Sequence, residues 1–474
     1  MRTIVLAGLL IACGGGGATP APKPPVQAKP LVQAPPAGPA QKPAKATFPG
    51  APATPAGDQL AWVLDKIVKR HGKLERAELE AHFHASFLAK VPSEQAQKIF
   101  EQLGQQLADL TITGVKGNDE QLVAHVTAGG SKLRISLALD PATKQISGLL
   151  IQLDVDAGPR PQSFGDALRT IAGLAPKAQL LVATLDKGTC KPQQELAASD
   201  ELAIGSTFKL YILLGLVDRI LAGKAAWSDE LAVRDDWKSL PSGITQNEPP
   251  GTKHSLQTFA ERMISISDNT AADHLLYTVG RKNVEAAVRA TKHARPALDT
   301  PFLSTRELFL FKLGMPGDEG GREGEINRYL KLPEAKRRDY LDKTLAGKAP
   351  SIDIAGTWKT ARRIDKLEWF ASAEDLCRTM ATLWTRAQDP KAAPLLDVLA
   401  KNPGLPIDPK VWPYIGFKGG SEPGVVNMTY LLERDDNQWF VITLGFNAAE
   451  GGTLDEAKIF AMTAGVIDLV GKAR

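Results

Sequence analysis

The sequence predicts an α+β protein with more than one folded unit. Residues 58–155 show helical apolar stripes followed by strand-like runs, and residues 160–474 show strand-like runs at both ends with helical stripes between them. Residues 14–57 precede both units and are rich in proline and alanine. A length of 474 residues and a hydrophobic content of 43% are typical of a chain whose units each bury a core.

Residues 1–13 are typical of a secretion signal. Arg2 precedes an apolar core over residues 4–11, and Leu10-Ile11-Ala12-Cys13 resembles a bacterial lipobox, whose cysteine is lipidated and becomes the new first residue. The alternative is an ordinary signal peptide with an incidental cysteine. We favour lipidation of Cys13, because it lies at the signal boundary and a tether-like segment follows. This apolar segment is too short to span a bilayer as a helix.

Residues 14–57 are expected to form a disordered tether. They hold 12 of the 33 prolines, four lysines and no acidic residue, so they cannot bury enough apolar surface to fold. Extended at about 3.1 Å per residue, the segment would reach on the order of 140 Å. Residues 1–57 hold five basic residues, which leaves 52 basic against 53 acidic residues in the rest of the chain. The nearly neutral folded part gives no indication of nucleic acid binding.

Residues 58–155 are expected to form a small α+β unit in which helices precede an antiparallel sheet. His82 and His84 flank Phe83, but a metal site would need further ligands, so none is expected, and a docking or positioning role is the default. The unit vaguely resembles cystatin-like and ketosteroid-isomerase-like domains. Helices are predicted over a stripe from Leu60 to Val68, over Arg76 to Phe83, and over Ser93 to Leu107 with Ser93 as its cap; strands are predicted over Leu110 to Val115, Gln121 to Val126, Lys132 to Leu139 and Ile146 to Leu153.

Ser206-Thr207-Phe208-Lys209 is the most informative stretch of the chain. It opens an apolar helical run, so Ser206 and Lys209 share one helix face. A serine hydroxyl becomes a nucleophile when a nearby base takes its proton, and a lysine whose charge is disfavoured by burial or by a second cation can be that base. A Ser-x-x-Lys motif alone is a weak signal, because about one is expected by chance in a chain this long.

Two later motifs strengthen this interpretation. Ser267-Asp268-Asn269 follows a helical stripe from Leu256 to Ile264 and precedes a second helix that is expected to stop at Gly280. In Lys418-Gly419-Gly420-Ser421, the lysine ends a strand-like run from Tyr414 to Lys418, and two further β-rich runs follow, Val425 to Leu432 and Trp439 to Leu444.

In this order and context, the three motifs resemble the signature of penicillin-recognising serine enzymes, and residues 179–474 resemble a class A β-lactamase. The resemblance implies a β-lactamase/transpeptidase-like fold, with an antiparallel sheet flanked by helices and a helical subdomain. Leu180 to Leu185 followed by Glu201 to Phe208 looks like the first strand pair leading into the nucleophile helix. Ser372 would cap a helix before the last strands, and the stretch from Leu454 to Val470 would form the closing helix.

The resemblance also implies roles for single residues. Ser206 would attack a carbonyl and form an acyl-enzyme, Lys209 would accept its proton, and Ser267 would pass a proton to the leaving group. Asn269 would bind a substrate amide and orient Lys209. Lys418 would bind a substrate carboxylate. Gly419 and Gly420 would let substrate lie against the strand edge, and the N–H groups of Ser206 and Ser421 would form the oxyanion site.

The loop glutamate pattern of class A β-lactamases, Arg-x-Glu-x-x-Leu-Asn, is absent. The nearest candidate for a deacylating base is Glu307; its alternative role is an acid at the start of the apolar helix from Leu308. A glycine-rich charged stretch from Gly314 to Glu325 is expected to form a loop near the site.

Structural alternatives exist for each motif taken alone. Ser206 could be a helix cap, Lys209 a solvated lysine, Ser267 and Asp268 helix caps, and Lys418 a surface strand residue. The three motifs in order and in context favour the catalytic interpretation. Cys190 and Cys377 could form a disulfide, but Cys377 lies on an apolar helix face, so we expect a buried thiol instead.

The leading hypothesis is therefore a lipid-anchored serine hydrolase of the bacterial cell envelope, periplasmic or on the outer membrane, acting on a β-lactam, ester or amide. The alternatives are a cell-wall D-alanyl-D-alanine peptidase that binds peptidoglycan stem peptides, or a non-catalytic envelope binding module with a degenerate site. No cofactor and no metal are expected, and a monomer is expected.

Overall fold

The computed structural model describes residues 48–89, 91–107, 109–128, 131–154, 160–240, 242–314, 322–348 and 358–473. Cys13, the signal segment and most of the predicted tether lie outside the described residues, as do residues 315–321 of the glycine-rich stretch from Gly314 to Glu325. The end of that stretch, residues 322–325, is helical rather than a loop as expected. The described chain divides into two compact units, with the main boundary between them in the sequence near residue 153. No helix among the described residues is long and apolar enough to cross a membrane.

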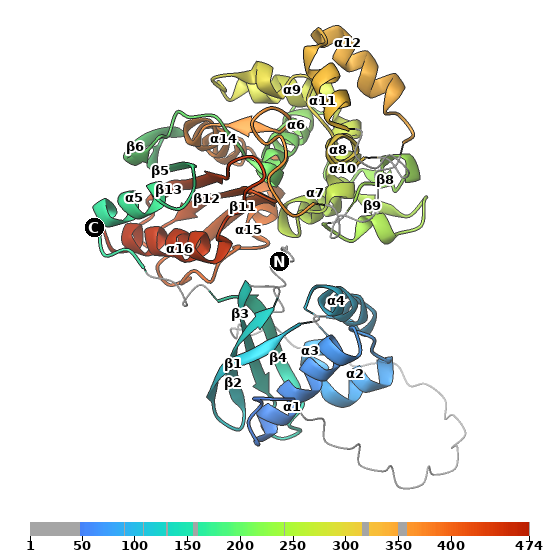
Figure 1. Ribbon diagram of the computed structural model, residues 1–474, viewed down its shortest axis with the longest axis vertical. Coiled ribbons are helices and arrows are strands. Elements are labelled where there is room, and N and C mark those ends of the chain that lie inside the picture. Colours follow the sequence, from blue (N-terminus) through green and yellow to red (C-terminus); the bar gives the residue numbers. More distant parts are fainter. Residues whose placement is uncertain are drawn as a thin grey trace. The chain divides into compact units, whose positions relative to one another are not determined.

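The amino-terminal unit has helices first and an antiparallel sheet afterwards, as predicted (Figure 1). Its four strands lie in the order β1-β2-β3-β4. The elements are α1 (Pro55–Leu64), a π-helix (Asp65–Lys69), α2 (Arg76–His82), α3 (Ala85–Leu88), α4 (Ser93–Gln106), β1 (Thr111–Gly117), β2 (Gln121–Ala128), β3 (Ser131–Leu139) and β4 (Ile146–Leu153).

The core of this unit is formed by side chains that alternate along its strands between buried and partly exposed positions. Along β2, Leu122, Ala124, Val126 and Ala128 are buried while the residues between them are partly exposed, as a strand with one covered face requires. Two details differ from prediction. The predicted boundary at 57/58 falls inside α1, which begins at Pro55 after the cap Thr54, and α4 is preceded by Pro92 rather than capped by the Ser93 side chain.

The carboxy-terminal unit is built on a five-stranded antiparallel sheet in the order β11-β12-β13-β5-β6. In β5, Leu180 and Val182 belong to one apolar core and Leu181 and Ala183 to another, because successive side chains point to opposite faces. Both faces are thus covered, which explains the continuous apolar run in the sequence. The strands are β5 (Lys177–Asp186), β6 (Thr189–Leu196), β11 (Tyr414–Glu422), β12 (Val425–Glu433) and β13 (Trp439–Asn447).

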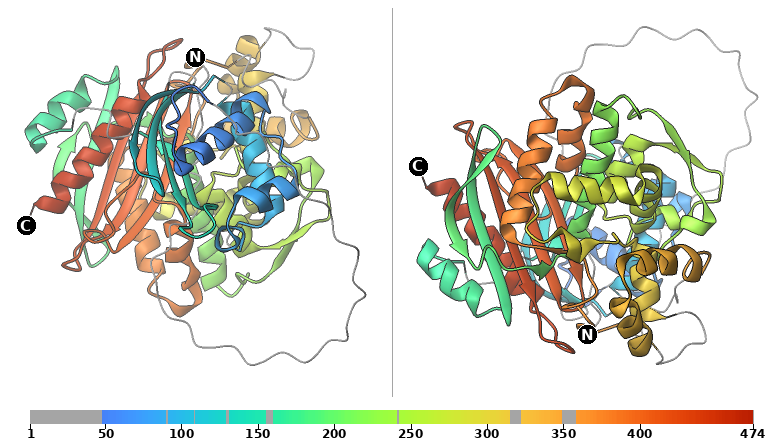
Figure 2. Two further views of the ribbon diagram at one scale, coloured as in Figure 1. Left: turned by 90° about the horizontal axis from the view of Figure 1, so that it is seen from below. Right: turned by 90° about the horizontal axis from the view of Figure 1, so that it is seen from above.

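Different helices cover the two faces of this sheet (Figure 2). The first and last helices of the unit, α5 and α16, share the core formed with Leu180 and Val182. The helical subdomain and α14 share the other core. These helices are α5 (Phe164–Ala172), α6 (Lys209–Leu221), α7 (Leu256–Ser265), α8 (Asn269–Val279), α9 (Arg281–Ala290), α10 (Thr305–Leu313), α11 (Arg322–Lys331), α12 (Glu334–Asp339), α14 (Ala373–Arg386), α15 (Pro394–Ala400) and α16 (Glu456–Lys472).

The predicted cap at Ser372 is confirmed, since its hydroxyl accepts from the N–H of Asp375 at the start of α14. The closing helix is also confirmed as α16. The unit has short strands as well: β7 (Leu202–Ala203) pairs with β10 (Phe370–Ala371), and β8 (Glu230–Ala232) pairs with β9 (Lys253–Ser255).

The first strand pair was predicted wrongly. The partner of β5 is β6, whereas the stretch from Glu201 to Phe208 contributes only the two residues of β7 before the turn Gly205–Phe208, called the nucleophile turn here because it carries the candidate nucleophile Ser206. β6 could not be predicted from the sequence, because polar side chains and Pro192 interrupt any strand-like apolar pattern. The structure tolerates Pro192 because β6 is an edge strand.

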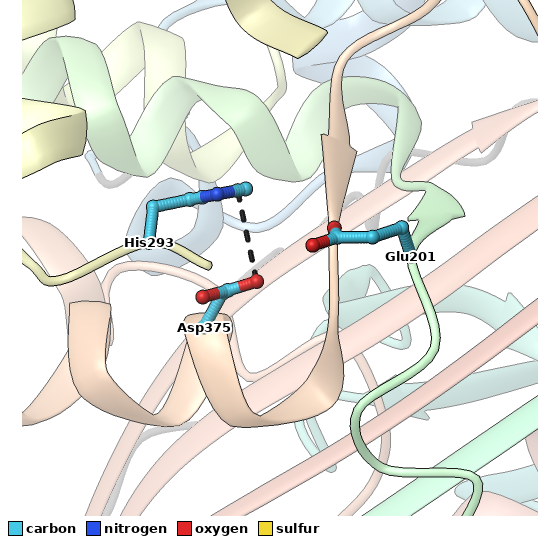
Figure 3. Close-up of side chains that lie close together, drawn as sticks. All are labelled: Glu201, His293 and Asp375. Atoms are coloured by element: carbon cyan, nitrogen blue, oxygen red, sulfur yellow. Dashed lines mark ion pairs between the residues drawn. The ribbon is translucent and has the colours of Figure 1, made fainter. Parts of the chain in front are cut away.

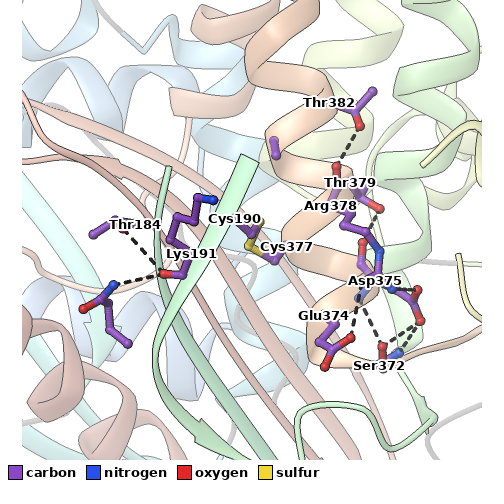
Figure 4. Close-up of a disulfide and its surroundings, with 12 residues drawn as sticks. Thr184, Cys190, Lys191, Ser372, Glu374, Asp375, Cys377, Arg378, Thr379 and Thr382 are labelled. Atoms are coloured by element: carbon purple, nitrogen blue, oxygen red, sulfur yellow. Dashed lines mark hydrogen bonds and ion pairs between the residues drawn. A yellow bond between two sulfur atoms is a disulfide. The ribbon is translucent and has the colours of Figure 1, made fainter. Parts of the chain in front are cut away.

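The expectation of a buried thiol at Cys377 was also wrong. Cys377 lies on an apolar helix face as predicted, yet it forms a disulfide with Cys190 that ties β6 to α14 (Figure 4). The two cysteines are 187 residues apart, and their Cα atoms are 6.3 Å apart, within the usual range for a disulfide. Sequence spacing alone could not reveal this, because the predicted topology lacked β6.

Candidate active site

Ser206 lies in a tight turn at the start of an apolar helix. A 3-10 helix, Gly205–Phe208, carries the serine and leads directly into α6, where Lys209 is the first residue. Ten residues of α6 are buried, so the helix is fixed on nearly all sides. Ser206 remains partly exposed while Lys209 is fully buried. The turn therefore presents a hydroxyl to solvent and hides the ammonium group behind it.

Ser267 lies in the turn between α7 and α8, as predicted. Its φ of 55° is in the left-handed region, which residues other than glycine rarely adopt, and such strain is often found at functional sites. The neighbouring Asp268 holds this turn in place. Its carboxylate caps α8 by accepting from the N–H of Ala271 at 2.8 Å, and it accepts from the N–H and hydroxyl of Thr245 at 2.9 and 2.8 Å.

Four oxygen atoms converge on the Lys209 ammonium. Nζ lies 3.1 Å from Ser206 Oγ and 3.0 Å from Ser267 Oγ. It also donates to the Ser267 carbonyl at 2.7 Å and to Asn269 Oδ1 at 2.6 Å. The two motifs, about 60 residues apart in sequence, therefore meet at one nitrogen atom that touches both candidate catalytic hydroxyls.

The third motif approaches from the sheet. Lys418 is buried on β11, and its ammonium donates to Ser267 Oγ at 3.2 Å and to the Gly419 carbonyl. Ser267 Oγ therefore contacts both candidate ammonium groups. The structure thus brings Ser206, Lys209, Ser267 and Lys418 into one hydrogen-bonded group.

Glycines allow β11 to lie directly against the nucleophile turn. A Cβ at Gly420 would lie 2.0 Å from the Ile204 carbonyl oxygen and 2.7 Å from the Ser206 nitrogen, which no side chain can satisfy. Gly205 has a φ of 47°, and a Cβ there would lie 3.1 Å from the Ser421 nitrogen. The backbones that carry the Ser206 and Ser421 N–H groups are therefore adjacent, as an oxyanion site needs.

Burial changes the protonation of both lysines. It lowers the pKa of Lys209 to about 7, against the opposing effect of the Asp268 and Asp273 carboxylates. Burial, with the added repulsion of Lys209, lowers the pKa of Lys418 well below its usual value. The Lys209 amine can therefore be neutral near neutral pH, as a general base requires.

Asn269 is a support for Lys209 in this structure. It is buried, its Oδ1 accepts from Lys209, and its Nδ2 donates to the Leu240 carbonyl at 3.1 Å. The predicted orientation of Lys209 by Asn269 thus matches the geometry. A contact between Asn269 and a substrate amide stays a prediction.

None of the hydrogen bonds of Glu307 reaches the residues above. Its carboxylate pairs with Arg281 through two bonds of 2.7 and 3.0 Å and accepts from the Ser304 N–H at 2.7 Å. Ser304 in turn caps α10 by accepting from the Glu307 N–H. These contacts correspond to the alternative prediction of an acid at a helix start, and they leave the catalytic role of Glu307 a prediction.

Two supporting residues were missed by the sequence analysis. Ser242 donates its hydroxyl to the Ser267 carbonyl at 2.7 Å. Asp273, buried on α8, accepts from the N–H groups of Thr305 and Arg306 and so joins α8 to α10. Burial raises the pKa of Asp273 to about 7. Asp273 follows Asn269 by four residues on the same helix face, a spacing that could have drawn attention to it.

A second cluster of titratable groups lies in the same unit. One potential ligand atom from each of Glu201, His293 and Asp375 lies within 4.8 Å of the others (Figure 3). The Arg295 N–H donates to His293 Nδ1 at 3.1 Å, which leaves the proton of the neutral ring on Nε2, 3.0 Å from the Phe370 carbonyl. Neither ring nitrogen then offers a lone pair, so the cluster does not fit a metal ion.

Comparisons with known families agree with this fold. The model of the β-lactamase enzyme family matches residues 165–461, and the chain belongs to that family. A second family model, described as the N-terminal part of the ORF 12 gene product, matches residues 51–144. The chain is thus a β-lactamase-like serine hydrolase family member with an additional amino-terminal unit.

Similar solved structures include a β-lactamase from Sphaerobacter thermophilus DSM 20745, at 17% identity, with 66% of this chain and 98% of that chain covered and a TM-score of 0.45. PBP-A is 16% identical, with coverages of 67% and 100% and a TM-score of 0.43. A β-lactamase from Chitinophaga pinensis DSM 2588 is 15% identical, with coverages of 65% and 99% and a TM-score of 0.43. No curated protein matches the chain.

Proposed function

We propose that this protein is an acyl-transferring serine hydrolase in which Ser206 is the nucleophile and Lys209 its base. The single observation that carries the proposal is the position of Lys209 Nζ, within 3.1 Å of the hydroxyls of both Ser206 and Ser267. A neutral amine at that distance can take the proton of Ser206 as its oxygen attacks a carbonyl.

The proton path follows from the same contacts. Ser206 Oγ forms a bond to the substrate carbonyl carbon while its proton moves to Lys209. Ser267 Oγ, in contact with Lys209 and Lys418, then gives its proton to the leaving nitrogen or oxygen and regains one from an ammonium group. The bond to the leaving group breaks and an acyl-enzyme on Ser206 remains.

The substrate class follows from charge and backbone geometry. The buried Lys418 supports binding of a substrate carboxylate, and the Ser206 and Ser421 N–H groups support stabilisation of the developing oxyanion. Gly419 and Gly420 add no side chains of their own to β11, and the Gly420 backbone lies directly against the turn that carries Ser206. A β-lactam, or an ester or amide that carries a carboxylate, meets these requirements.

Slow release of the acyl group is the second part of the proposal. Among the described residues, no carboxylate hydrogen-bonds to Ser206 or Lys209, and Glu307 is committed to Arg281 and Ser304. This observation favours a D-alanyl-D-alanine peptidase or penicillin-binding activity on peptidoglycan stem peptides over rapid β-lactam hydrolysis.

The location that we propose is the bacterial cell envelope. The leader with its lipobox cysteine Cys13 supports a lipid anchor, and the disulfide between Cys190 and Cys377 supports an oxidising compartment such as the periplasm.

Intact-protein mass spectrometry tests this proposal. Incubation with benzylpenicillin should add one penicilloyl mass to the wild type, and the lifetime of that adduct reports release separately from formation. Ser206→Ala should add nothing, while Ser372→Ala, which removes a serine that only caps α14, should label like the wild type. Labelling of Ser206→Ala at the wild-type level would show that the nucleophile is another residue.

A further inference from the structure

A buried ion triad lies beside the candidate active site. Lys312, on α10, has a fully buried side chain whose ammonium pairs with Glu368 and with Glu422 Oε1, the latter at 2.5 Å. The side chains of Glu368 and Glu422 are 0% and 8% exposed, so the triad is cut off from water. The proposed reaction uses none of these groups.

The triad balances its charges internally. Burial raises the pKa of Glu422 well above its usual value, and the adjacent Glu368 carboxylate raises it further against the opposing effect of Lys312. A protonated Glu422 can donate to Glu368, whose buried Oε2 otherwise has no hydrogen-bond partner among the described residues.

Glu422 links Lys312 to β11, the strand that carries Ser421, whose N–H is the second candidate oxyanion donor. Glu422 is the last residue of β11 and directly follows Ser421. Lys418, Gly420 and Glu422 alternate on the buried side of this strand. Fixing the Glu422 side chain therefore fixes the Ser421 peptide at the point where β11 meets the nucleophile turn.

Glu368 links Lys312 to the nucleophile turn. Glu368 is followed by Trp369, whose carbonyl accepts from the Ile204 N–H at 3.0 Å. The Trp369 ring stacks on Phe208 with centroids 3.7 Å apart. These two contacts hold Ile204 and Phe208, which flank Gly205 and Ser206 in the sequence, so a shift of Glu368 can move the Ser206 N–H.

We propose that Lys312 is a positioning residue that, through Glu368 and Glu422, sets the distance between the Ser206 and Ser421 N–H groups. The assignment deepens the proposed function and rests on it, because these N–H groups matter as the oxyanion site of the acylation. An error in donor placement costs rate in the transition state, where the oxyanion develops, and loss of one donor typically costs about 10² to 10³ in rate.

Segment-resolved hydrogen exchange of the free protein tests the positioning without any reaction. Glu422→Ala leaves the Lys312–Glu368 pair intact and should speed exchange about tenfold or more over residues 417–422 only. Glu368→Ala should do so over residues 201–209. Lys312→Met should speed exchange in both segments. Arg434→Met, which removes a buried arginine that binds the end of α16, is the control and should change neither.

Measurements on the penicilloyl-enzyme test whether the positioning by Lys312 affects catalysis. In the penicilloyl-enzyme, weaker oxyanion hydrogen bonds should shift the ester carbonyl infrared band to higher wavenumber in Lys312→Met and slow acylation about tenfold or more, while Lys312→Arg recovers part of both. Exchange rates and carbonyl bands equal to those of Arg434→Met would overturn the positioning role. A wild type that forms no adduct on Ser206 would overturn the proposed function instead, and the exchange experiment would still decide the first question.

Discussion

Among single residues, Lys209 combines two properties that rarely occur together. It is completely buried, yet all four of its hydrogen-bond partners are neutral oxygens rather than carboxylates. The nearest carboxylates, Asp268 and Asp273, only partly offset the cost of burying its charge. The structure therefore keeps the proton of Lys209 weakly bound, which a base needs and which an ordinary structural ion pair would prevent.

A pH dependence of acylation follows. Because burial lowers the pKa of Lys209 to about 7, Lys209 is protonated and inactive as a base below that pH and neutral above it. The acylation rate constant for a fluorescent penicillin should therefore rise with pH through about 7 and level off above. Stopped-flow measurement of the labelling rate between about pH 5.5 and pH 9 checks this. A rate that falls across that range would require a different base.

Gly420 is the residue at which the smallest change should have the largest effect. In Gly420→Ala, the new Cβ would overlap the Ile204 carbonyl and the Ser206 nitrogen, so β11 and the nucleophile turn must move apart. We expect acylation to fall at least about 100-fold and the free energy of unfolding to fall by about 1–3 kcal/mol.

The matched control for this change is Gly165→Ala. Gly165 lies on α5, where an added Cβ meets only ordinary contacts at 3.6 Å and beyond. Acylation kinetics and urea unfolding of both variants give the comparison. A Gly420→Ala variant that labels as fast as Gly165→Ala would show that the close approach has no catalytic role.

Among the secondary-structure elements, α10 shows how one residue admits two interpretations. Glu307 stands at its start, where an acid can cap a helix or serve as a base. In the structure it does the first, with Arg281 and Ser304 as partners.

We therefore expect Glu307→Gln to lower the free energy of unfolding by about 1–3 kcal/mol, since it weakens a buried charge-assisted pair. The lifetime of the penicilloyl adduct should stay within about threefold of the wild type, because chemistry that does not use this carboxylate should not lose the 10²- to 10⁴-fold that general-base catalysis typically supplies. Chemical denaturation and time-resolved mass spectrometry measure the two quantities. A lifetime prolonged about 100-fold would identify Glu307 as the deacylation base.

Most of the secondary-structure elements that carry the motifs could be predicted from the sequence. Apolar periodicity predicted α6, α7, α8 and the strands β11 to β13 that carry the motifs, because these elements bury continuous or alternating faces. It could not predict β6, an exposed edge strand whose residues carry no such pattern. The groups formed by Lys312 and by His293 were also hidden, because each joins side chains from distant segments whose proximity only the folded chain defines.

Across the whole molecule, the covalent link between β6 and α14 is the main constraint that packing does not supply. It closes a loop of 187 residues within the carboxy-terminal unit. This loop includes the nucleophile turn, the Ser267 turn and the whole helical subdomain, but none of the catalytic atoms touches the sulfur atoms.

The double variant Cys190→Ser/Cys377→Ser should therefore lose about 2–5 kcal/mol of unfolding free energy and keep wild-type acylation at a temperature where it stays folded. Urea unfolding with and without a reducing agent should show the same loss in the wild type and no effect of reductant on the variant. A slower acylation rate in the folded variant would show that the link also shapes the site.

The strand order bears on which edge of the sheet can pair with another polypeptide. At one end of the sheet, β6 carries Lys191 and Pro192 and is bound by sulfur to α14, features that discourage a neighbouring polypeptide from adding a strand. At the other end, β11 carries Gly419 and Gly420, and the Gly420 backbone lies against that of Ser206. We therefore expect an extended peptide not to pair with β6, where pairing would only seed aggregates, and to bind beside β11, where its carbonyl would lie near Ser206.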